Sequence, residues 1–216
     1  MHNRYIWLLR EPRTGSSWLA SHLQDKLNLK MIFIDEMPEF NKFPADVPHP
    51  NHFPDDVRLI GTHYFVHLMN LSNFDNPLVI RTTRRSKSDR CISMLYSKIY
   101  GTWHWRPDVL SEKTLQRTLE NPMYVTKQKV KVIMENFKSQ EDEWFRFCDQ
   151  YETNTVVYED LFDGVYIPGL NTTVKFSDDS SKHIKFPDRT RAFINYEEIV
   201  KWCSEYEDSM GFKKYE

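Results

Sequence analysis

The chain has 216 residues, with 29 lysines and arginines against 31 aspartates and glutamates. This length suits one sizeable core, so we expect a single domain over residues 1–216. The near-balance of charge gives no global basic field, so we expect no nucleic-acid partner, and any anion site must be a local cluster. The sequence contains neither a run of about 18 apolar residues nor a signal-peptide pattern, so we expect a cytoplasmic protein without membrane contact. The three widely spaced cysteines indicate neither a disulfide framework nor a zinc site.

Short apolar and β-branched runs alternate with helical patterns along the chain. The strands are predicted over about residues 4–9, 30–34, 57–62, 78–83 and 155–158. The helices are predicted over residues 16–29, 89–100 and 195–210, and over residues 125–151 as one helix or a pair. Residues 35–56 hold five prolines and read as a long loop or lid. The alternation predicts an α/β three-layer sandwich, with helices on both faces of a mainly parallel five-stranded sheet.

The most informative segment is EPRTGSSWL, residues 11–19, which lies between the first predicted strand and the first predicted helix. The first N–H groups of a helix that starts near Ser16 would point at an anion. Arg13 supplies a positive charge there, and Ser16 and Ser17 supply hydroxyls. The segment lacks the Gly-Lys-[Ser/Thr] of the P-loop in nucleoside triphosphatases, so we do not expect an ordinary triphosphate.

The ends of the other predicted strands also carry polar residues. In a parallel sheet, ligands collect at the carboxyl ends of the strands. His63 follows the third strand, a basic run that includes Arg85 follows the fourth, and Tyr158 follows the fifth. This set suits a nucleotide with two separate anionic groups, one at the Arg13 loop and one at the Arg85 cluster, with His63 near the reacting end.

Two of these motifs resemble segments of the sulfotransferases that use 3′-phosphoadenosine 5′-phosphosulfate (PAPS), around the 5′-phosphosulfate and the catalytic base. The stretch EPRTGSSWL is similar to the 5′-phosphosulfate loop of that family, with Arg13 at the lysine position and Trp18 on the tryptophan. The stretch VRLIGTHYFVHL resembles the strand that ends in Lys-Thr-His. It puts His63 on the catalytic base and Gly61 where a lysine is common.

Two further motifs resemble the part of the same family that holds the rest of the nucleotide. The stretch LVIRTTRRSKSDRCIS resembles the 3′-phosphate motif, with Arg85, Asp89 and Ser93 in its arginine, aspartate and serine positions. The stretch TVVYEDL is similar to the strand end whose tyrosine, here Tyr158, lies near the adenine. All four motifs occur in the family's order, each at the end of a predicted strand.

The resemblance implies a fold similar to the P-loop nucleoside triphosphatases and transfer of a sulfuryl group from PAPS to a hydroxyl or amine of a small-molecule or carbohydrate acceptor. His63 would be the general base, and Arg13 would stabilise the transferring group. No metal is implied. The desulfated product would be 3′-phosphoadenosine 5′-phosphate (PAP). The implied cofactor-binding residues are Arg13, Thr14, Gly15, Ser16, Ser17, Trp18, Arg85, Ser93 and Tyr158.

The chain also departs from the family pattern. It lacks the Arg-Lys-Gly tripeptide that covers the 3′-phosphate in cytosolic members, and Lys182, Lys185, Arg189 or Arg191 would have to replace it. The acceptor walls are expected in residues 35–56 and 101–107, because both segments are irregular and neither is needed to close the sheet.

Several alternatives stay open. The chain could be a non-catalytic module that binds PAP or PAPS, or a nucleotide-dependent kinase with a degenerate phosphate loop. His63 and His67, four residues apart, could belong to a metal site, although no third ligand stands at a supporting spacing. Glu159 and Asp160 could be an acid–base pair, but acidic residues are also favoured at the start of a helix, and that structural interpretation is preferred.

Overall fold

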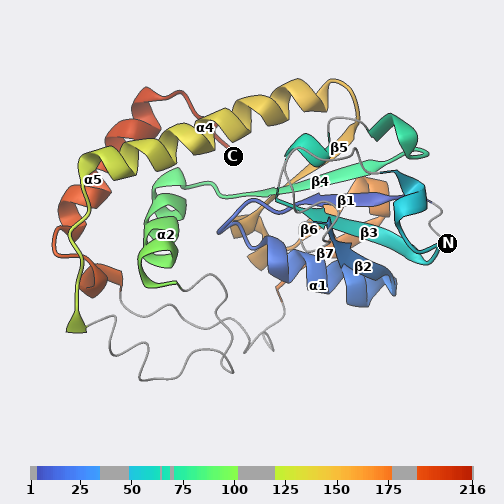
Figure 1. Ribbon diagram of the computed structural model, residues 1–216, viewed down its shortest axis with the longest axis horizontal. Helices are drawn as coiled ribbons and strands as arrows, with labels where there is room; N and C mark the ends of the chain where they lie inside the picture. The colour runs from blue at the N-terminus through green and yellow to red at the C-terminus, as the bar shows by residue number, and fades with distance from the viewer. Residues whose placement is uncertain are drawn as a thin grey trace. The chain divides into compact units, whose positions relative to one another are not determined.

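The computed structural model of the chain describes residues 4–34, 49–63, 65–68, 71–101, 120–176 and 189–215. The chain divides into two compact units, each made of two segments (Figure 1). Unit 1 comprises Met1–Arg85 and Glu143–Phe176, and unit 2 comprises Ser86–Asp142 and Ser177–Glu216. The expected single domain therefore stays a prediction.

Unit 1 is built on a five-stranded parallel sheet, which confirms the predicted fold class. Its strands are β1 (Ile6–Leu9), β2 (Lys30–Phe33), β3 (Val57–Thr62), β4 (Leu78–Thr83) and β5 (Glu152–Val157), in the order β2-β3-β1-β4-β5. The central strand β1 pairs with β3 on one side and with β4 on the other, and Leu9 aligns with Thr62 and with Arg81. The carboxyl ends of these three strands therefore lie side by side.

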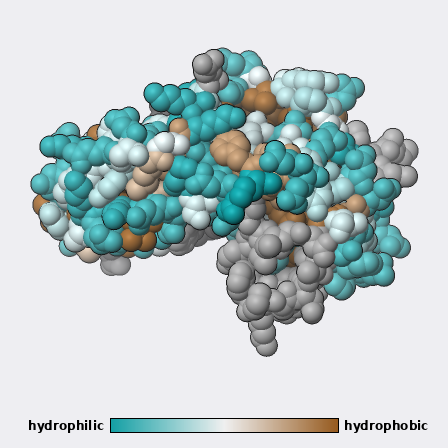
Figure 2. Space-filling model, turned by 90° about the horizontal axis from the view of Figure 1, so that it is seen from above, coloured by the Kyte–Doolittle hydropathy of each residue, from teal (hydrophilic) through white to brown (hydrophobic). Residues whose placement is uncertain are grey.

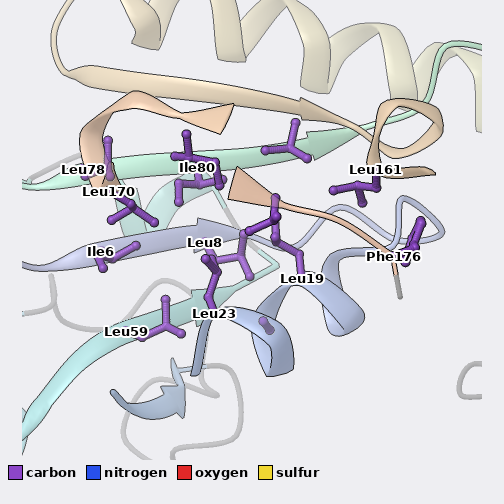
Figure 3. Close-up of a cluster of buried hydrophobic side chains, with 14 residues drawn as sticks. Ile6, Leu8, Leu19, Leu23, Leu59, Leu78, Ile80, Leu161, Leu170 and Phe176 are labelled. Atoms are coloured by element: carbon purple, nitrogen blue, oxygen red, sulfur yellow. The ribbon is translucent and has the colours of Figure 1, made fainter. Parts of the chain in front are cut away.

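Both faces of the sheet are covered, because β1 is apolar at every position and alternates its side chains between the faces. On one face Ile6 and Leu8 pack against Leu19 and Leu23 of helix α1 (Ser16–Leu27), and Figure 3 shows these side chains pointing toward one another. On the other face the buried cluster around Trp7 includes residues from the last turns of helix α4 (Lys127–Cys148). The result is the predicted three-layer arrangement of helix, sheet and helix.

A small antiparallel sheet of unit 1 was not predicted. It consists of β6 (Val165–Ile167) and β7 (Thr172–Val174), which are joined by a turn at Asn171 in the left-handed conformation, with φ 47°. Three-residue strands are too short to show a period of two in the sequence. Short 3-10 helices occupy Pro50–His52, Phe65–Leu68, Leu71–Asn73, Tyr158–Phe162 and Pro168–Leu170 in this unit, and Arg189–Ala192 in unit 2.

Unit 2 contains α2 (Lys87–Tyr100), α5 (Tyr196–Ser209) and the residues of α4 up to Asp142. The helix predicted over residues 125–151 is one continuous helix rather than a pair. The core of unit 2 brings Cys91 of α2 against Cys203 of α5, both fully buried. A hydrogen bond with Cys203, together with burial, raises the pKa of the Cys91 thiol well above its usual value.

The outer surfaces are polar in the face that Figure 2 shows, where hydrophilic residues predominate in teal and apolar patches are small. The ion pair between Lys127 of α4 and Glu205 of α5 is exposed. Among the described residues, no helix combines the length and the apolar character that crossing a bilayer requires.

Candidate functional site

The loop between β1 and α1 lies at a topological switch point of the sheet. Strand order reverses about β1, because the chain places β3 on one side of β1 and then continues with β4 on the other side. In open α/β sheets, the crevice outside the carboxyl ends of strands at such a point is where ligands bind. Residues of β1, β3 and β4 that were predicted to form the site are thereby brought to one edge of unit 1.

The backbone of this loop is held in an uncommon conformation. Arg13 has φ 66° and Gly15 has φ 77°, so both lie in the left-handed region. A Cβ atom at Gly15 would come within 2.5 Å of Cδ2 of Tyr158, so the position requires glycine for space as well as for conformation. Non-glycine residues with positive φ are uncommon and cluster at functional sites. The half-buried Arg13 is such a residue.

The hydroxyl groups of Thr14 and Ser16, two of the predicted cofactor-binding residues, hold the loop together. The Thr14 hydroxyl donates to the Glu11 carbonyl oxygen at 2.7 Å and lies 2.5 Å from the hydroxyl of Thr82 on β4. The Ser16 hydroxyl also donates to the Glu11 carbonyl oxygen, at 3.4 Å. Both hydroxyl groups thus bond to the protein in this structure, and the contact of Thr14 and Ser16 with a cofactor stays a prediction. Ser17, by contrast, is exposed.

A buried ion pair fixes the base of the loop to the sheet. The Nε atom of Arg81 lies 2.5 Å from Oε1 of Glu11, and both side chains are almost fully buried. The Arg81 guanidinium also lies over the ring of Trp144, 5.5 Å from its centroid. This pair could not be predicted from the sequence, because a charged residue inside a strand gives no local sign of its partner 70 positions away. The pair gives the loop a rigid support.

His63 stands beside this loop at the end of β3. Its Nδ1 atom lies 2.6 Å from the carbonyl oxygen of Arg10, and a carbonyl only accepts, so Nδ1 carries the proton in the neutral ring. Nε2 is then the nitrogen that can accept a proton. His67 has a different environment, because it is buried and its Nδ1 lies 2.7 Å from the Thr62 hydroxyl. The described residues contain no group of three potential metal ligands, so the metal interpretation gains no support.

The basic run after β4 meets the acidic residues after β5. The Arg85 main-chain N–H donates to Oε2 of Glu159 at 2.9 Å, and its guanidinium lies 2.5 Å from Oδ1 of Asp160. This supports the structural interpretation of Glu159 and Asp160. Arg84 takes another direction, with its guanidinium 4.3 Å from the ring centroid of Tyr158. Arg85 is the residue of this run that was predicted to bind phosphate, and in this structure its partner is a carboxylate.

Trp18 and Tyr158, two of the predicted cofactor-binding residues, belong to one aromatic cluster. Trp18 stacks on His22 at 4.7 Å and packs against Phe176 at 4.2 Å between ring centroids. Tyr158 contacts Phe176 and Phe162 edge to face. Phe162 is 58% exposed and was not predicted as a site residue, although it lies four residues after Tyr158. An adenine would therefore meet an aromatic surface that already exists around Trp18 and Tyr158.

The last predicted residue, Ser93, is fully buried in α2 and belongs to unit 2, whereas Arg85 belongs to unit 1. Their joint contact with a 3′-phosphate stays a prediction. The start of α2 already holds a protein anion. The carboxylate of Glu207 in α5 accepts from the main-chain N–H groups of Lys87 and Ser88, both at 2.8 Å, and from the Ser88 hydroxyl at 2.5 Å. Asp89, in the aspartate position of the motif, is exposed, and its N–H is capped by Ser86.

Several predicted regions fall wholly or partly outside the described residues. Of the two expected acceptor walls, the structure describes only residues 49–56 and residue 101. Lys182 and Lys185 lie outside it, Arg189 is described only in its main chain, and Arg191 is exposed in unit 2. The assignment of the acceptor walls and of a replacement for the Arg-Lys-Gly loop therefore stays a prediction.

A pocket of about 440 Å³ lies at the start of α5 in unit 2. Its described lining includes the carboxylates of Glu197 and Glu198 and no basic side chain, so it does not suit an anion. It contains none of the predicted site residues. We infer the site at the end of β1 from geometry and charge.

Comparison of the chain with protein-family models, with curated proteins and with solved structures found no significant match to any of them. The functional assignment consequently depends on the arrangement of the residues themselves.

Proposed function

We propose that this protein is a sulfotransferase that transfers the sulfuryl group of PAPS to a hydroxyl or amine of a small-molecule or carbohydrate acceptor. One observation carries the proposal. The loop of residues 11–17, with the start of α1 behind it, lies at the switch point of the parallel sheet between a histidine that ends β3 and the arginines that follow β4. The strand order and the loop also support, without establishing, the proposed relation to P-loop folds.

On the donor side, Arg13 and the N–H groups of residues 15–17 would hold the departing 5′-phosphate. Sulfuryl transfer, like phosphoryl transfer, is expected to run in line through a loose transition state, in which negative charge accumulates on the leaving phosphate. Positively charged groups fixed in place before the reaction stabilise that charge most effectively. The partial positive charge at the start of α1 adds to that of Arg13.

On the acceptor side, His63 would act as the general base through Nε2. The acceptor hydroxyl gives its proton to Nε2 while its oxygen forms a bond to sulfur. The bond between sulfur and the bridging phosphate oxygen breaks, and its electron pair leaves with PAP. The hydrogen bond from Nδ1 to the Arg10 carbonyl oxygen orients the ring for this role. Only neutral His63 is active in this step.

At the other end of the nucleotide, Arg85 would exchange Asp160 for the 3′-phosphate. Both side chains of this ion pair are about 40% exposed, and an exposed pair contributes only about 0–1 kcal/mol. A bidentate contact between the guanidinium and a phosphate is stronger than that, so the exchange is favourable. Trp18 and Tyr158 would contact the adenine.

Two substitutions with opposite expected effects test the role of Arg85. Arg85→Ala should weaken the binding of PAP much more than the binding of adenosine 5′-phosphate (AMP), which lacks the 3′-phosphate. Asp160→Ala should instead tighten PAP, because it removes the carboxylate that competes for Arg85. Both affinities are measured by calorimetry. Equal losses of PAP and AMP in Arg85→Ala would exclude Arg85 as the 3′-phosphate residue.

The catalytic proposal is tested with His63→Gln. We expect the release of PAP from PAPS, in the presence of a panel of phenols, sugars and amines, to fall by roughly 10²- to 10⁴-fold. The PAP affinity should stay within a few-fold of the wild type. The control is Arg58→Gln, near the start of β3 and away from the carboxyl ends of the strands, which should leave both quantities unchanged. A large loss of PAP affinity in His63→Gln would make His63 a binding residue rather than the base.

A non-catalytic PAP-binding module is the second candidate, and one observation favours it. Gly61 stands where the resemblance puts a lysine, so the chain lacks that cation close to His63. Such a module would bind PAP without turning over PAPS, and His63→Gln would have no effect on any measured rate.

A further inference from the structure

We infer that Arg10, a residue outside every motif of the sequence, is a second cation of the loop and binds the same anion as Arg13. The inference rests on the proposed function, and it names a binding residue that the proposed function did not assign. Its evidence is the path of the Arg10 main chain, the burial of its side chain and the direction of its guanidinium.

The Arg10 main chain connects the loop to the proposed base. Its N–H donates to the Thr62 carbonyl oxygen at 2.7 Å, which extends the pairing of β1 and β3 by one residue. Its carbonyl oxygen accepts from Nδ1 of His63 at 2.6 Å. Arg10 therefore lies between the phosphate loop and His63, at the position where a transferring group would pass from one to the other.

The Arg10 side chain is only 5% exposed, which is unusual for an arginine. Its guanidinium carbon lies 3.8 Å from the ring centroid of Phe33. Gly61 makes the room for both groups, because a Cβ there would lie 2.6 Å from Cδ1 of Phe33 and 2.9 Å from Cδ of Arg10. A side chain at position 61 would displace Arg10. Gly61 thus lacks the cation that a lysine would supply at this position, and it leaves the space that the Arg10 side chain occupies.

The guanidinium points toward the start of α1. Its Nη2 atom donates to the Ser17 hydroxyl at 3.3 Å, in the first turn of the helix. The same first turn carries the main-chain N–H groups that are proposed to hold the 5′-phosphate. An external anion bound in the loop would lie between the Arg10 guanidinium, Ser17 and the helix N–H groups.

The chemical class of the anion follows from this geometry. A guanidinium and a series of N–H groups together match a tetrahedral oxyanion with several acceptor oxygens. In the proposed reaction this anion is the departing 5′-phosphate with the sulfuryl group attached to it. Arg10 would therefore act on the 5′ end of the nucleotide, whereas Arg85 acts on the 3′ end.

The test is calorimetric titration of wild type and Arg10→Met with PAP, AMP and inorganic phosphate. Methionine keeps an apolar contact with the Phe33 ring and removes the charge, so the fold should be retained, and circular dichroism checks this. We expect PAP and AMP to weaken by the same factor, roughly 10- to 100-fold, because both carry the 5′-phosphate. Arg10→Lys should recover part of the affinity.

The matched control is Arg58→Met. Arg58 is also an arginine of the sheet in unit 1 and also lies over an aromatic ring, with its guanidinium carbon 5.1 Å from the centroid of Tyr5. It stands near the start of β3, away from the carboxyl ends of the strands. Arg58→Met should leave all three affinities unchanged.

The outcomes separate this inference from the proposed function. The role of Arg10 is overturned, and the proposed function survives, if Arg10→Met binds PAP as tightly as the wild type does. The same holds if the affinity for PAP falls while the affinity for AMP does not. If wild type binds inorganic phosphate in an Arg10-dependent way but binds no PAP, the proposed function fails and the role of Arg10 stands. If wild type binds none of the three probes, both are overturned.

Discussion

Helices α1 and α2 both begin next to arginines, and their N-termini are satisfied in different ways. At α2, Ser86 caps the N–H of Asp89, and the carboxylate of Glu207 accepts from the next two N–H groups. At α1, the part of the chain that the structure describes provides neither a side-chain cap nor an acidic residue in the first turn. The start of α2 is thus bound by a carboxylate of α5, whereas we propose that the start of α1 binds the 5′-phosphate.

The comparison explains why a basic run before a helix is an ambiguous signal. The run at residues 84–87 resembles a phosphate motif, yet two of its cations have carboxylate partners: Arg85 with Asp160, and Lys87 with Glu141 at 3.5 Å. The loop at residues 10–17 presents Arg10, Arg13 and an exposed Ser17 around a helix start. We therefore expect the 5′ end of the nucleotide to be held in a rigid, preformed place and the 3′ end to be held by exchange of partners.

The largest loss of stability should come from breaking the buried ion pair between Arg81 and Glu11 at the base of the α1 loop. Arg81→Met leaves Glu11 as a buried charge without its ion-pair partner, and breaking a buried pair costs about 3–5 kcal/mol. The measurement is the free energy of unfolding in urea. The control, Lys30→Met, breaks an exposed pair with Asp56 and should cost about 0–1 kcal/mol. The double variant Glu11→Gln with Arg81→Met should be more stable than Arg81→Met alone, and the opposite order would contradict the account.

The next effect concerns the turn that opens α1. Gly15→Ala introduces a residue at φ 77° and a methyl group 2.5 Å from Tyr158, so it combines a left-handed cost of about 1–2 kcal/mol with overpacking of about 1–3 kcal/mol. Gly101→Ala, at the end of α2, has φ 68° and nothing within 4 Å of the new methyl group. Unfolding in urea should show Gly15→Ala as the more destabilising. Equal destabilisation by the two substitutions would mean that contact with Tyr158 does not restrict the side chain at position 15.

A smaller effect is expected at α2. Glu207→Ala leaves the N–H groups of Lys87 and Ser88 without their acceptor, which should cost about 1–3 kcal/mol. Added sulfate should then restore part of the stability, because the emptied helix start becomes an anion site. Thermal unfolding in sulfate and in chloride measures this. Glu205→Ala, which removes an exposed carboxylate of α5, the helix that also carries Glu207, should not be stabilised by sulfate in this way.

The smallest expected effect is a pH dependence of stability that is caused by His22 in α1. Burial, and secondarily Lys26, lowers the pKa of His22 below its ordinary value of 6.5, against a weaker raising effect of Asp25. The unfolded chain therefore binds the proton more strongly, and the contribution of His22 to stability is lost as the pH falls below about 6.5. His22→Gln should reduce the difference between urea midpoints at pH 7.5 and pH 5.5. An unchanged difference would contradict this assignment.

The sequence predicted the main elements because each is long enough to show its period. Strands β3 and β4 were predicted with the bounds that the structure has, and α1 within two residues. The start of β5 was missed because Glu152, Thr153 and Asn154 are polar and partly exposed, so they do not read as a buried strand. The hairpin of β6 and β7 was missed because each strand has only three residues.

The sequence predicted which positions of unit 1 lie at the carboxyl edge of the sheet, but not where their side chains point. The inward turn of the Ser16 hydroxyl depends on the left-handed residues at 13 and 15, which a sequence pattern does not show. The contact of Glu207 with Ser88 joins positions 119 apart. The burial of Arg10 could not be predicted from the sequence, because it depends on the space that Gly61 leaves.

The most direct test of the account is a thermal-shift titration of the wild-type protein with PAP, AMP and ATP with Mg²⁺. A ligand at about 100 times its dissociation constant adds roughly 2.7 kcal/mol of stability, which is readily measured. We predict a shift with PAP, a smaller one with AMP at the same concentration, and the least with ATP and Mg²⁺. A shift with ATP and Mg²⁺ alone, or with none of the three, would contradict the central claim that the end of β1 binds the 5′ end of a 3′-phosphorylated nucleotide.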